Sequence, residues 1–229
     1  MPWNTSRIQA LLFDLDGTLL DAFDQYALSL IAALKHFYLP TPSRERVRQL
    51  MGSSGEYALL SLGVLPEQVP EAQRRWVEWA QAVAHLARPF PGVVPLLKRL
   101  RAAGYRLGIV TSRPHRSVEI TPSAMELASL VDLVVARDDT EEGKPHPEPV
   151  LYALRRLALT PEQAAYVGDA HYDIEAGWRA GCLTILATWD GVHLDPDAQY
   201  QPHFTVATPE ELADLVLNGR LEEQGHCAD

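Results

Sequence analysis

Two carboxylates at the end of an apolar run are the first residues in this sequence that could do chemistry. The stretch from Leu11 to Asp21 reads LLFDLDGTLLD, so Asp14 and Asp16 are two positions apart. In an extended strand such residues share a face, where two carboxylates repel each other unless a cation or a shared proton lies between them. The other interpretation is a strand that ends in an ordinary Asp/Gly turn. The stretch alone leaves both interpretations open.

Two further stretches place polar side chains directly after strand-like runs or in a restricted loop. In VTSRP, at 110–114, Thr111 and Ser112 offer hydroxyls and Arg113 offers a cation; a helix cap is the alternative use of such hydroxyls. In GKPHPEP, at 143–149, Lys144 lies in a proline-rich backbone, where the alternative is a simple surface charge. Both stretches could serve an anionic ligand.

A third stretch, GDAHYDIEAGWRAG at 168–181, carries two more carboxylates. Asp169 and Asp173 are four positions apart across a turn into a predicted helix, close enough to share a cation. An Asp-rich turn can also cap a helix, so this stretch too has a purely structural interpretation.

The elements that must position these residues follow from the apolar pattern. Short apolar runs occur at 8–13, 105–110, 130–136, 164–167 and 183–187, and helical patterns lie between them at 94–102 and 149–158. Strands alternating with helices predict an α/β fold with right-handed crossovers and a mostly parallel sheet. Ligands bind such sheets beyond the carboxyl ends of the strands, which is where Asp14 is expected.

The segment 22–88 has a different character. Its apolar residues recur at helical spacing, and no convincing strand interrupts them: Ala27, Leu30, Ile31 and Leu34 early on, then Trp76, Trp79, Val83 and Leu86. The segment closes at RPFPG, at 88–92. The pattern predicts a helical insert that stands over the strand ends like a lid, with the tryptophans in its core.

Composition narrows the class of protein. The 229 residues suit one sizeable core, or a core with a smaller insert. The formal net charge of -10 argues against nucleic acid or an anionic membrane as the main partner. Cys182 and Cys227 lie far apart without a CxxC or Cys/His cluster, which indicates neither a zinc site nor a disulfide framework. No apolar run reaches the length of a membrane span, and we expect a cytoplasmic protein with a polar, frayed tail after Asn218.

The order of these motifs resembles the haloacid dehalogenase superfamily of phosphohydrolases. A strand ending DxDGT, a strand ending in a hydroxyl, a KP pair and a strand ending GDxxxD follow one another between Asp14 and Asp173. The resemblance implies a doubly wound, Rossmann-like parallel α/β core with a helical cap inserted after the first strand. Residues 1–21 and 89–229 would form this core, and residues 22–88 the cap.

The resemblance also implies roles for the motif residues. Asp14 is expected to be the nucleophile that forms an aspartyl-phosphate, and Asp16 the general acid and base. Thr111 would hydrogen-bond a phosphoryl oxygen, and Lys144 would offset negative charge on the phosphoryl group and the nucleophile; Ser112 and Arg113 would complete the substrate-binding set. Mg²⁺ would be held by Asp14, the backbone carbonyl of Asp16, Asp169 and Asp173.

The resemblance is greatest to the phosphoglycolate phosphatase and pyrophosphatase-type branch, so we expect a small phosphorylated metabolite as substrate and a monomer or homodimer as the assembly. A sugar phosphomutase of the β-phosphoglucomutase type and a non-catalytic phosphate-binding regulator stay as alternatives.

The loop Met51–Glu56 (MGSSGE) either reaches toward the nucleophile or simply joins two helices. Asp21 is expected to cap the following helix or to mark the hinge into the insert.

Overall fold

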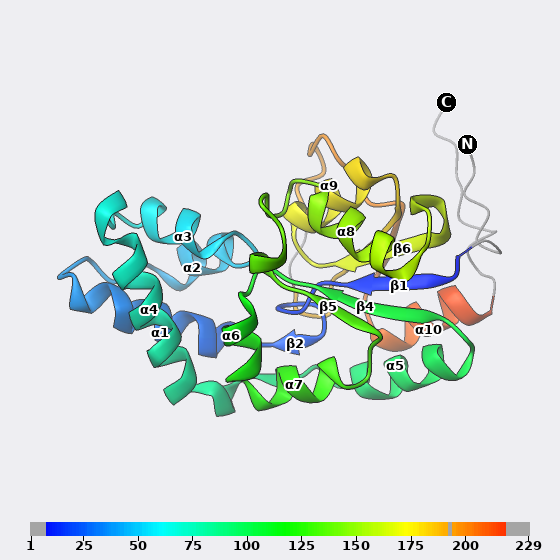
Figure 1. The fold of residues 1–229 in the computed structure, drawn as a ribbon, viewed down its shortest axis with the longest axis horizontal. Coiled ribbons are helices and arrows are strands. Elements are labelled where there is room, and N and C mark those ends of the chain that lie inside the picture. Colours follow the sequence, from blue (N-terminus) through cyan, green and yellow to red (C-terminus); the bar gives the residue numbers. More distant parts are fainter. Residues whose placement is uncertain (1–7, 192–193, 219–229) are drawn as a thin grey trace.

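A six-stranded parallel sheet forms the centre of the molecule in the computed structural model, which describes residues 8–191 and 194–218 (Figure 1). The strand order is β5-β4-β1-β6-β7-β8, and every neighbouring pair is parallel. The strands are β1 (Ala10–Phe13), β4 (Arg106–Val110), β5 (Leu133–Val135), β6 (Ala164–Gly168), β7 (Leu183–Ala187) and β8 (Phe204–Val206). The predicted doubly wound α/β fold is therefore confirmed.

All five strands predicted from apolar runs are present, with ends that differ by up to three residues. The run at 183–187 matches β7, whereas the run at 130–136 contains only the three-residue strand β5. The edge strand β8 has no counterpart in the prediction. Only Val206 of its three residues is buried, so the sequence carries no continuous apolar run there.

Helices cover both faces of this sheet. On one face lie α5 (Val93–Ala102), α7 (Pro122–Ala128) and α10 (Pro209–Leu217), and on the other lie α8 (Glu148–Leu157) and α9 (His171–Ala180) (Figure 1). The short helix α6 (His115–Glu119) follows β4. Each face has its own buried apolar cluster, which explains why the central strands read as unbroken apolar runs rather than alternating ones.

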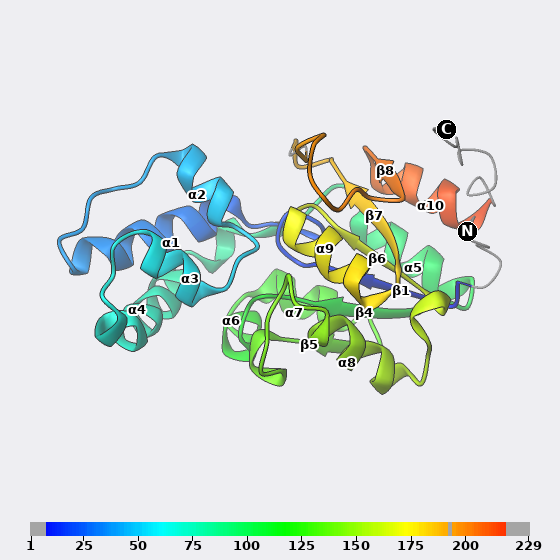
Figure 2. The same ribbon diagram turned by 90° about the horizontal axis from the view of Figure 1, so that it is seen from above.

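A helical unit lies beside the sheet, beyond the carboxyl ends of its strands (Figure 2). It contains α1 (Phe23–His36), α2 (Arg44–Leu50), α3 (Gly55–Ser61) and α4 (Val69–Ala82), and α1 packs along α4. The unit has a separate apolar cluster that includes Leu30, Leu34 and Leu59. Trp76 packs against this cluster, but Trp79 is 48% exposed, so the prediction that the tryptophans lie in the core is wrong for Trp79.

Two short antiparallel strands join the helical unit to the sheet. Strand β2 (Leu20–Asp21) pairs with β3 (Arg88–Pro89), which places Asp21 opposite Arg88. Asp21 is not the cap of α1, because the N-cap is Ala22 and no side chain bonds the helix end. Asp21 instead lies in β2, directly before α1, where the chain enters the helical unit.

The topology explains why chemistry is expected at Asp14. From β1 the chain goes to β4 and β5 on one side and later crosses to β6 on the other, so the connections diverge at β1. Such a point leaves a crevice outside the carboxyl ends of the strands, and Asp14 is the first residue after β1. The Asp14 amide still bonds the Val167 carbonyl of β6 at 2.8 Å, which fixes the position of its backbone.

The structure bears on two of the predictions from composition, those on membrane spans and on the cysteines. No helix within the described residues is long and apolar enough to cross a membrane. Cys182 is a buried free cysteine, whereas Cys227 and the tail after Asn218 lie outside the described residues. The cytoplasmic location stays a prediction.

Leu12 provides a test of the packing that holds β1. Its side chain is fully buried among the residues that contact α8 and α9, so Leu12→Ala should lower the free energy of unfolding by about 2–5 kcal/mol through lost burial and a cavity. Leu28→Ala, at a residue that is 51% exposed on α1, should change it by less than about 0.5 kcal/mol. Urea denaturation measures both, and equal effects of the two substitutions would contradict this view of the sheet.

Candidate active site

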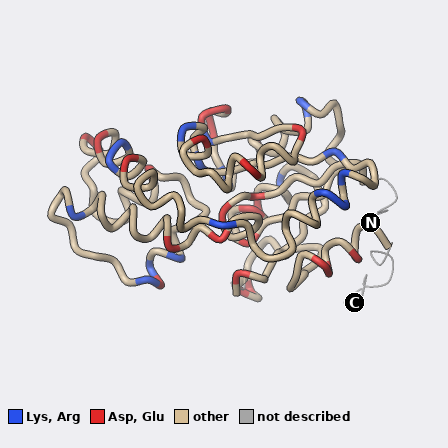
Figure 3. The backbone as a smooth tube through the Cα atoms, turned by 90° about the horizontal axis from the view of Figure 1, so that it is seen from below, with Lys and Arg blue, Asp and Glu red and all other residues tan. Residues whose placement is uncertain are grey.

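Three buried carboxylates and one buried lysine meet at the carboxyl ends of β1 and β6. The lysine comes from the loop that follows β5. Carboxylate oxygens of Asp14, Asp169 and Asp173 lie within 4.8 Å of one another. Lys144 Nζ donates to Asp14 Oδ1 at 2.5 Å and to Asp173 Oδ1 at 2.6 Å. The side chain of Lys144 is 1% exposed, which excludes the surface-charge interpretation. Figure 3 shows acidic positions gathered where the sheet meets the helical unit.

Lys144 has further partners that fix its position. Its ammonium group also donates to the Val110 carbonyl at 3.3 Å and lies 5.9 Å from the centre of the Tyr166 ring. The Tyr166 hydroxyl contacts Val110 O at 3.3 Å and Asp173 Oδ1 at 3.2 Å. Tyr166 points from the middle of β6 into this network and is fully buried. Each polar atom near the lysine therefore has a partner, as buried polar groups require.

Burial sets the electrostatics of the site. Burial, opposed by Lys144 and reinforced by Asp173 and Asp16, raises the pKa of Asp14 to about 7. Burial also raises the pKa of Asp169 well above its ordinary value, with Asp14 and Asp173 adding to the effect. For Lys144, burial lowers the pKa, but Asp14 and Asp173 outweigh it and raise the pKa well above the ordinary value. Lys144 is thus a fixed cation beside more carboxylates than it can neutralise.

Local sequence places Asp169 against the turn after β1. Thr18 Oγ1 donates to Asp169 Oδ1 at 2.8 Å, and Trp189 Nε1 donates to the Thr18 carbonyl at 2.8 Å. Gly17 has a φ of +92°, and a Cβ there would overlap the Asp169 carboxylate. The glycine of DGT is therefore required twice, by its backbone conformation and by the close approach of this carboxylate.

Asp173 has a structural role as well as its place in the cluster. Its Oδ2 accepts a hydrogen bond from the Ala170 amide at 3.1 Å, at the beginning of α9. Its Oδ1 accepts from Lys144. One oxygen of Asp173 therefore bonds the backbone at the beginning of α9, and the other belongs to the buried network around Lys144.

Asp16 points to different partners from Asp14. Arg113 Nε donates to Asp16 Oδ2 and Arg113 Nη2 to Asp16 Oδ1, both at 2.6 Å. The same guanidinium donates to Gln25 Oε1 at 3.0 Å and to Thr121 Oγ1 at 3.1 Å. Gln25 lies on α1, so this network ties the helical unit to the strand ends. The carboxylate of Asp16 is outside the group formed by Asp14, Asp169 and Asp173, which leaves only its backbone carbonyl for the metal-ligand role predicted for it.

Thr111 and Ser112 lie at the end of β4 beside the same space. Thr111 is buried, and its Oγ1 accepts a hydrogen bond from the Arg113 amide at 3.1 Å. The cap of α6 is Pro114, so neither hydroxyl caps that helix. Ser112 Oγ donates to the Gly52 carbonyl at 2.8 Å, which joins the loop Met51–Glu56 to the sheet.

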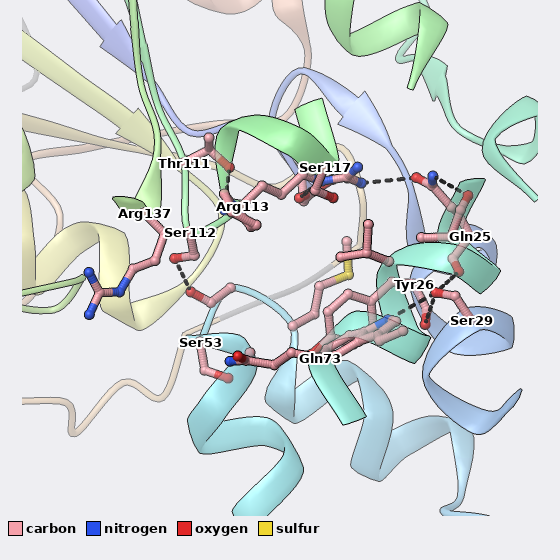
Figure 4. A pocket seen from close by; sticks show the side chains of 18 of the residues that line it. Gln25, Tyr26, Ser29, Ser53, Gln73, Thr111, Ser112, Arg113, Ser117 and Arg137 are labelled. Atoms are coloured by element: carbon pink, nitrogen blue, oxygen red, sulfur yellow. Dashed lines mark hydrogen bonds and ion pairs between the residues drawn. The ribbon is translucent and has the colours of Figure 1, made fainter. Parts of the chain in front are cut away.

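These groups border a cavity of about 310 Å³ between the sheet and the helical unit (Figure 4). Asp14, Asp16, Thr111, Ser112 and Arg113 line it from the strand ends. Residues of the predicted loop line it from the other side: Met51, Gly52, Ser53 and Gly55. Lys144, Asp169 and Asp173 are absent from this lining, and Asp14 joins their buried cluster to the cavity. The cavity volume is at the low end of the range of about 300–1,000 Å³ for small-molecule sites.

Sequence reasoning missed several residues around this site. Gln25, Tyr26 and Ser29 of α1 line the cavity, as does Trp76 of α4. Gln25 is 1% exposed, but it lies on the side of α1 opposite the predicted apolar residues Leu30 and Leu34, so the apolar pattern gives no signal for it. Tyr166 gives no signal either, because a tyrosine within a buried strand is an ordinary core residue.

The donor set fits a hard divalent cation. The group of Asp14, Asp169 and Asp173 offers only carboxylate oxygens, which such cations prefer. Lys144 supplies one positive charge to these three carboxylates, and the raised pKa values of Asp14 and Asp169 show that further positive charge would stabilise their ionised forms. A metal ion could therefore bind this cluster.

Comparison with known proteins identifies the family. The family model for the haloacid dehalogenase-like hydrolases matches residues 11–187, which include all four motifs. The pyrophosphatase PpaX of Anoxybacillus flavithermus is 33% identical, with 92% of this chain and 96% of the relative covered. The phosphoglycolate phosphatase of Aquifex aeolicus is 34% identical, with 94% and 100% covered.

The fold agrees with the sequence match. The solved structure of a haloacid dehalogenase-like family hydrolase from Streptococcus pneumoniae has a TM-score of 0.79 at 26% identity, with 92% of this chain and 99% of that chain covered. The chain belongs to the haloacid dehalogenase-like hydrolase family. It is a hydrolase of this family, and the two relatives named above are both phosphatases by name.

The raised pKa of Asp14 generates a prediction on metal binding. In metal-free protein Asp14 is protonated below about pH 7, so its contribution to stability is full below the unfolded pKa and is lost as the pH rises through 7. Metal binding requires the ionised carboxylate, so the rise in Tm caused by Mg²⁺ should be larger at pH 8 than at pH 5. At a hundredfold excess over Kd the rise should be about 5–10 °C.

Differential scanning calorimetry with Mg²⁺ or with chelator measures this rise. Asp169→Asn should lose it, whereas Asp21→Asn, at an exposed carboxylate in β2, should keep it. A rise that is the same at both pH values, or one that survives Asp169→Asn, would show that the ion binds elsewhere.

Proposed function

We propose that this protein is a Mg²⁺-dependent phosphatase that hydrolyses a small phosphorylated metabolite through an aspartyl-phosphate on Asp14. The observation that carries the proposal is the position of Asp14, which lies at the end of β1, lines the cavity and accepts a hydrogen bond from the buried ammonium of Lys144. A carboxylate beside a fixed cation, open to a cavity, is suited to attack an electrophile that carries negative charge.

In the first step, a carboxylate oxygen of Asp14 attacks phosphorus, and the bond from phosphorus to the leaving oxygen breaks. Asp16 gives its proton to that oxygen. In the second step a water molecule attacks the phosphorus, Asp16 takes the proton of this water, and the bond from phosphorus to Asp14 breaks to release phosphate. In the structure Asp16 is paired with Arg113, so it must take up a proton and loosen this pair before it can act as an acid.

The remaining motif residues stabilise charge. Lys144 donates to Asp14 and would also face a phosphoryl group bound there, and the Thr111 hydroxyl lines the same cavity. Asp14, Asp169, Asp173 and the Asp16 carbonyl would hold Mg²⁺, which supplies positive charge to the phosphoryl oxygens when bound. Ser112 and Arg113 would border the substrate.

Residues 22–88 would act as the cap of this enzyme, and residues 1–21 and 89–229 as its catalytic core. The hinge strands β2 and β3 join the two parts, and the cavity lies between them. Motion about this hinge would admit substrate and then exclude water, as lids do in other enzymes.

Phosphoglycolate and pyrophosphate are the substrate classes that the names of the relatives suggest. Phosphate release should be measured from both, and from nucleoside monophosphates and sugar phosphates, with Mg²⁺ and again with chelator. Release that needs Mg²⁺ supports the proposal. Isomerisation of β-glucose 1-phosphate without release would favour the phosphomutase, and phosphate binding without turnover would favour the regulator.

Asp14→Asn tests the nucleophile. The substitution keeps the size of the side chain and its hydrogen bonding, so the Tm should stay near that of the unmodified protein, while kcat should fall by at least about a thousandfold. Asp197→Asn serves as the control, because Asp197 is exposed in the loop between β7 and β8 and outside the cavity lining. Activity of Asp14→Asn close to that of the control would refute the role of Asp14.

A further inference from the structure

The helical unit contributes an uncharged wall to the active-site cavity. Among the described residues that line the cavity, those from the helical unit are Gln25, Tyr26, Ser29, Met51, Gly52, Ser53, Gly55, Gln73, Trp76, Val77 and Ala80. No member of this set is ionisable at neutral pH. The part of a substrate that extends away from Asp14 must lie against this wall, because the strand ends occupy the opposite side.

The arginines of the helical unit are engaged elsewhere. Arg44 pairs with Asp24 and Arg48 with Asp190, Arg74 and Arg75 both pair with Glu71, and Arg46 donates to the amide oxygen of Gln49. None of these arginines is among the described residues that line the cavity. An anionic leaving group would therefore find no cation on this wall.

The two arginines that line the cavity come from the sheet side and not from this wall. Arg113 donates from Nε and Nη2 to the Asp16 carboxylate, from Nη2 also to Gln25, and from Nη1 to Thr121. In this arrangement its charge is matched by a carboxylate, and each guanidinium nitrogen has a partner. Arg137 donates to the carbonyls of Thr140 and Glu141, and Figure 4 shows its guanidinium pointing away from the other labelled residues.

The wall instead presents aromatic and aliphatic surface with few free polar groups. Tyr26 and Trp76 contact each other edge to face, with ring centres 5.1 Å apart, and Met51 and Val77 lie on the same wall. Trp76 Nε1 donates to Ser29 Oγ at 3.0 Å, and the Tyr26 hydroxyl donates to the Leu50 carbonyl at 3.2 Å.

Gln73 differs from these residues, because its amide makes no hydrogen bond with a described residue. It is therefore free to bond a neutral polar group of a ligand.

We infer that the leaving group of the substrate is uncharged and carries a ring with an apolar face, so that the preferred substrate is a hexose phosphate or an aryl phosphate. The inference rests on the proposed phosphatase function. A neutral ring can pack on Trp76 and Tyr26 and bond Gln73, and its burial leaves no charge unpaired. Against this wall the carboxylate of glycolate or a second phosphate would lose water without gaining a cation from the helical unit, which opposes its binding.

The first experiment compares kcat/KM with Mg²⁺ for glucose 6-phosphate, phenyl phosphate, phosphoglycolate and pyrophosphate. At least one neutral-ring compound should exceed both anionic ones by about tenfold or more, because an unpaired buried charge is costly. A hexose preference would indicate that Gln73 selects hydroxyls, and an aryl preference that the aromatic wall dominates. Either result supports the inference.

A second experiment adds a cation to the wall. Gln73→Lys should raise kcat/KM for phosphoglycolate relative to that for the preferred neutral compound by about tenfold, because the ammonium can pair with the glycolate carboxylate. Gln81→Lys is the matched control on the same helix: Gln81 is exposed and absent from the cavity lining, so this substitution should leave the ratio unchanged.

The outcomes separate the two proposals. If phosphoglycolate or pyrophosphate is hydrolysed as fast as the neutral compounds or faster, the inference is overturned and the phosphatase function stands. If none of the four compounds, nor any in the wider panel, releases phosphate, the proposed function fails and the inference fails with it. Calorimetric binding to Asp14→Asn gives a check without turnover: tighter binding of phosphoglycolate than of glucose 6-phosphate would again overturn the inference.

Discussion

The contact between the Lys144 ammonium and the carboxylates of Asp14 and Asp173 is the interaction on which the rest of this site depends. Several carboxylates buried at the ends of neighbouring strands would otherwise repel one another in a medium that stabilises charge poorly. Lys144 lowers the pKa of Asp14, but burial, to which Asp173 and Asp16 add, still raises it to about 7, and burial likewise raises the pKa of Asp169. A bound cation would stabilise the ionised forms of these carboxylates.

The fold serves this contact in several ways. The divergence of connections at β1 opens the crevice, and the left-handed conformation of Gly17 lets the Asp169 carboxylate approach the turn. Thr18, Tyr166 and the Val110 carbonyl supply the remaining hydrogen bonds to the carboxylates and the lysine. Thr18, Val110 and Tyr166 are themselves fully buried, and the sheet has an apolar cluster on each face, so the charged site is held by packed surroundings.

The molecule divides its two tasks between two surfaces of one cavity. The strand ends carry the charges expected for chemistry at phosphorus, and the helical unit carries neutral, largely aromatic surface expected for selection of the leaving group. Arg113 and Gln25 connect the surfaces, since the guanidinium bonds both Asp16 and this α1 side chain. A change in the position of the helical unit would therefore reach Asp16 directly, through one shared hydrogen-bond network.

The sequence by itself determined the parallel α/β core, the helical character of 22–88 and the four motifs, because apolar periodicity and chain order are local properties. It did not reveal β8, whose exposed residues give no apolar run, or the exposure of Trp79. It also left open whether Lys144 is a surface charge and whether Asp173 only caps a helix. Tertiary structure decided both questions. It alone placed Gln25 beside Arg113 and left the cavity wall formed by the helical unit without a charged side chain among the described residues. Burial and pairing across 29 to 130 positions of chain are set by packing, which no local pattern encodes.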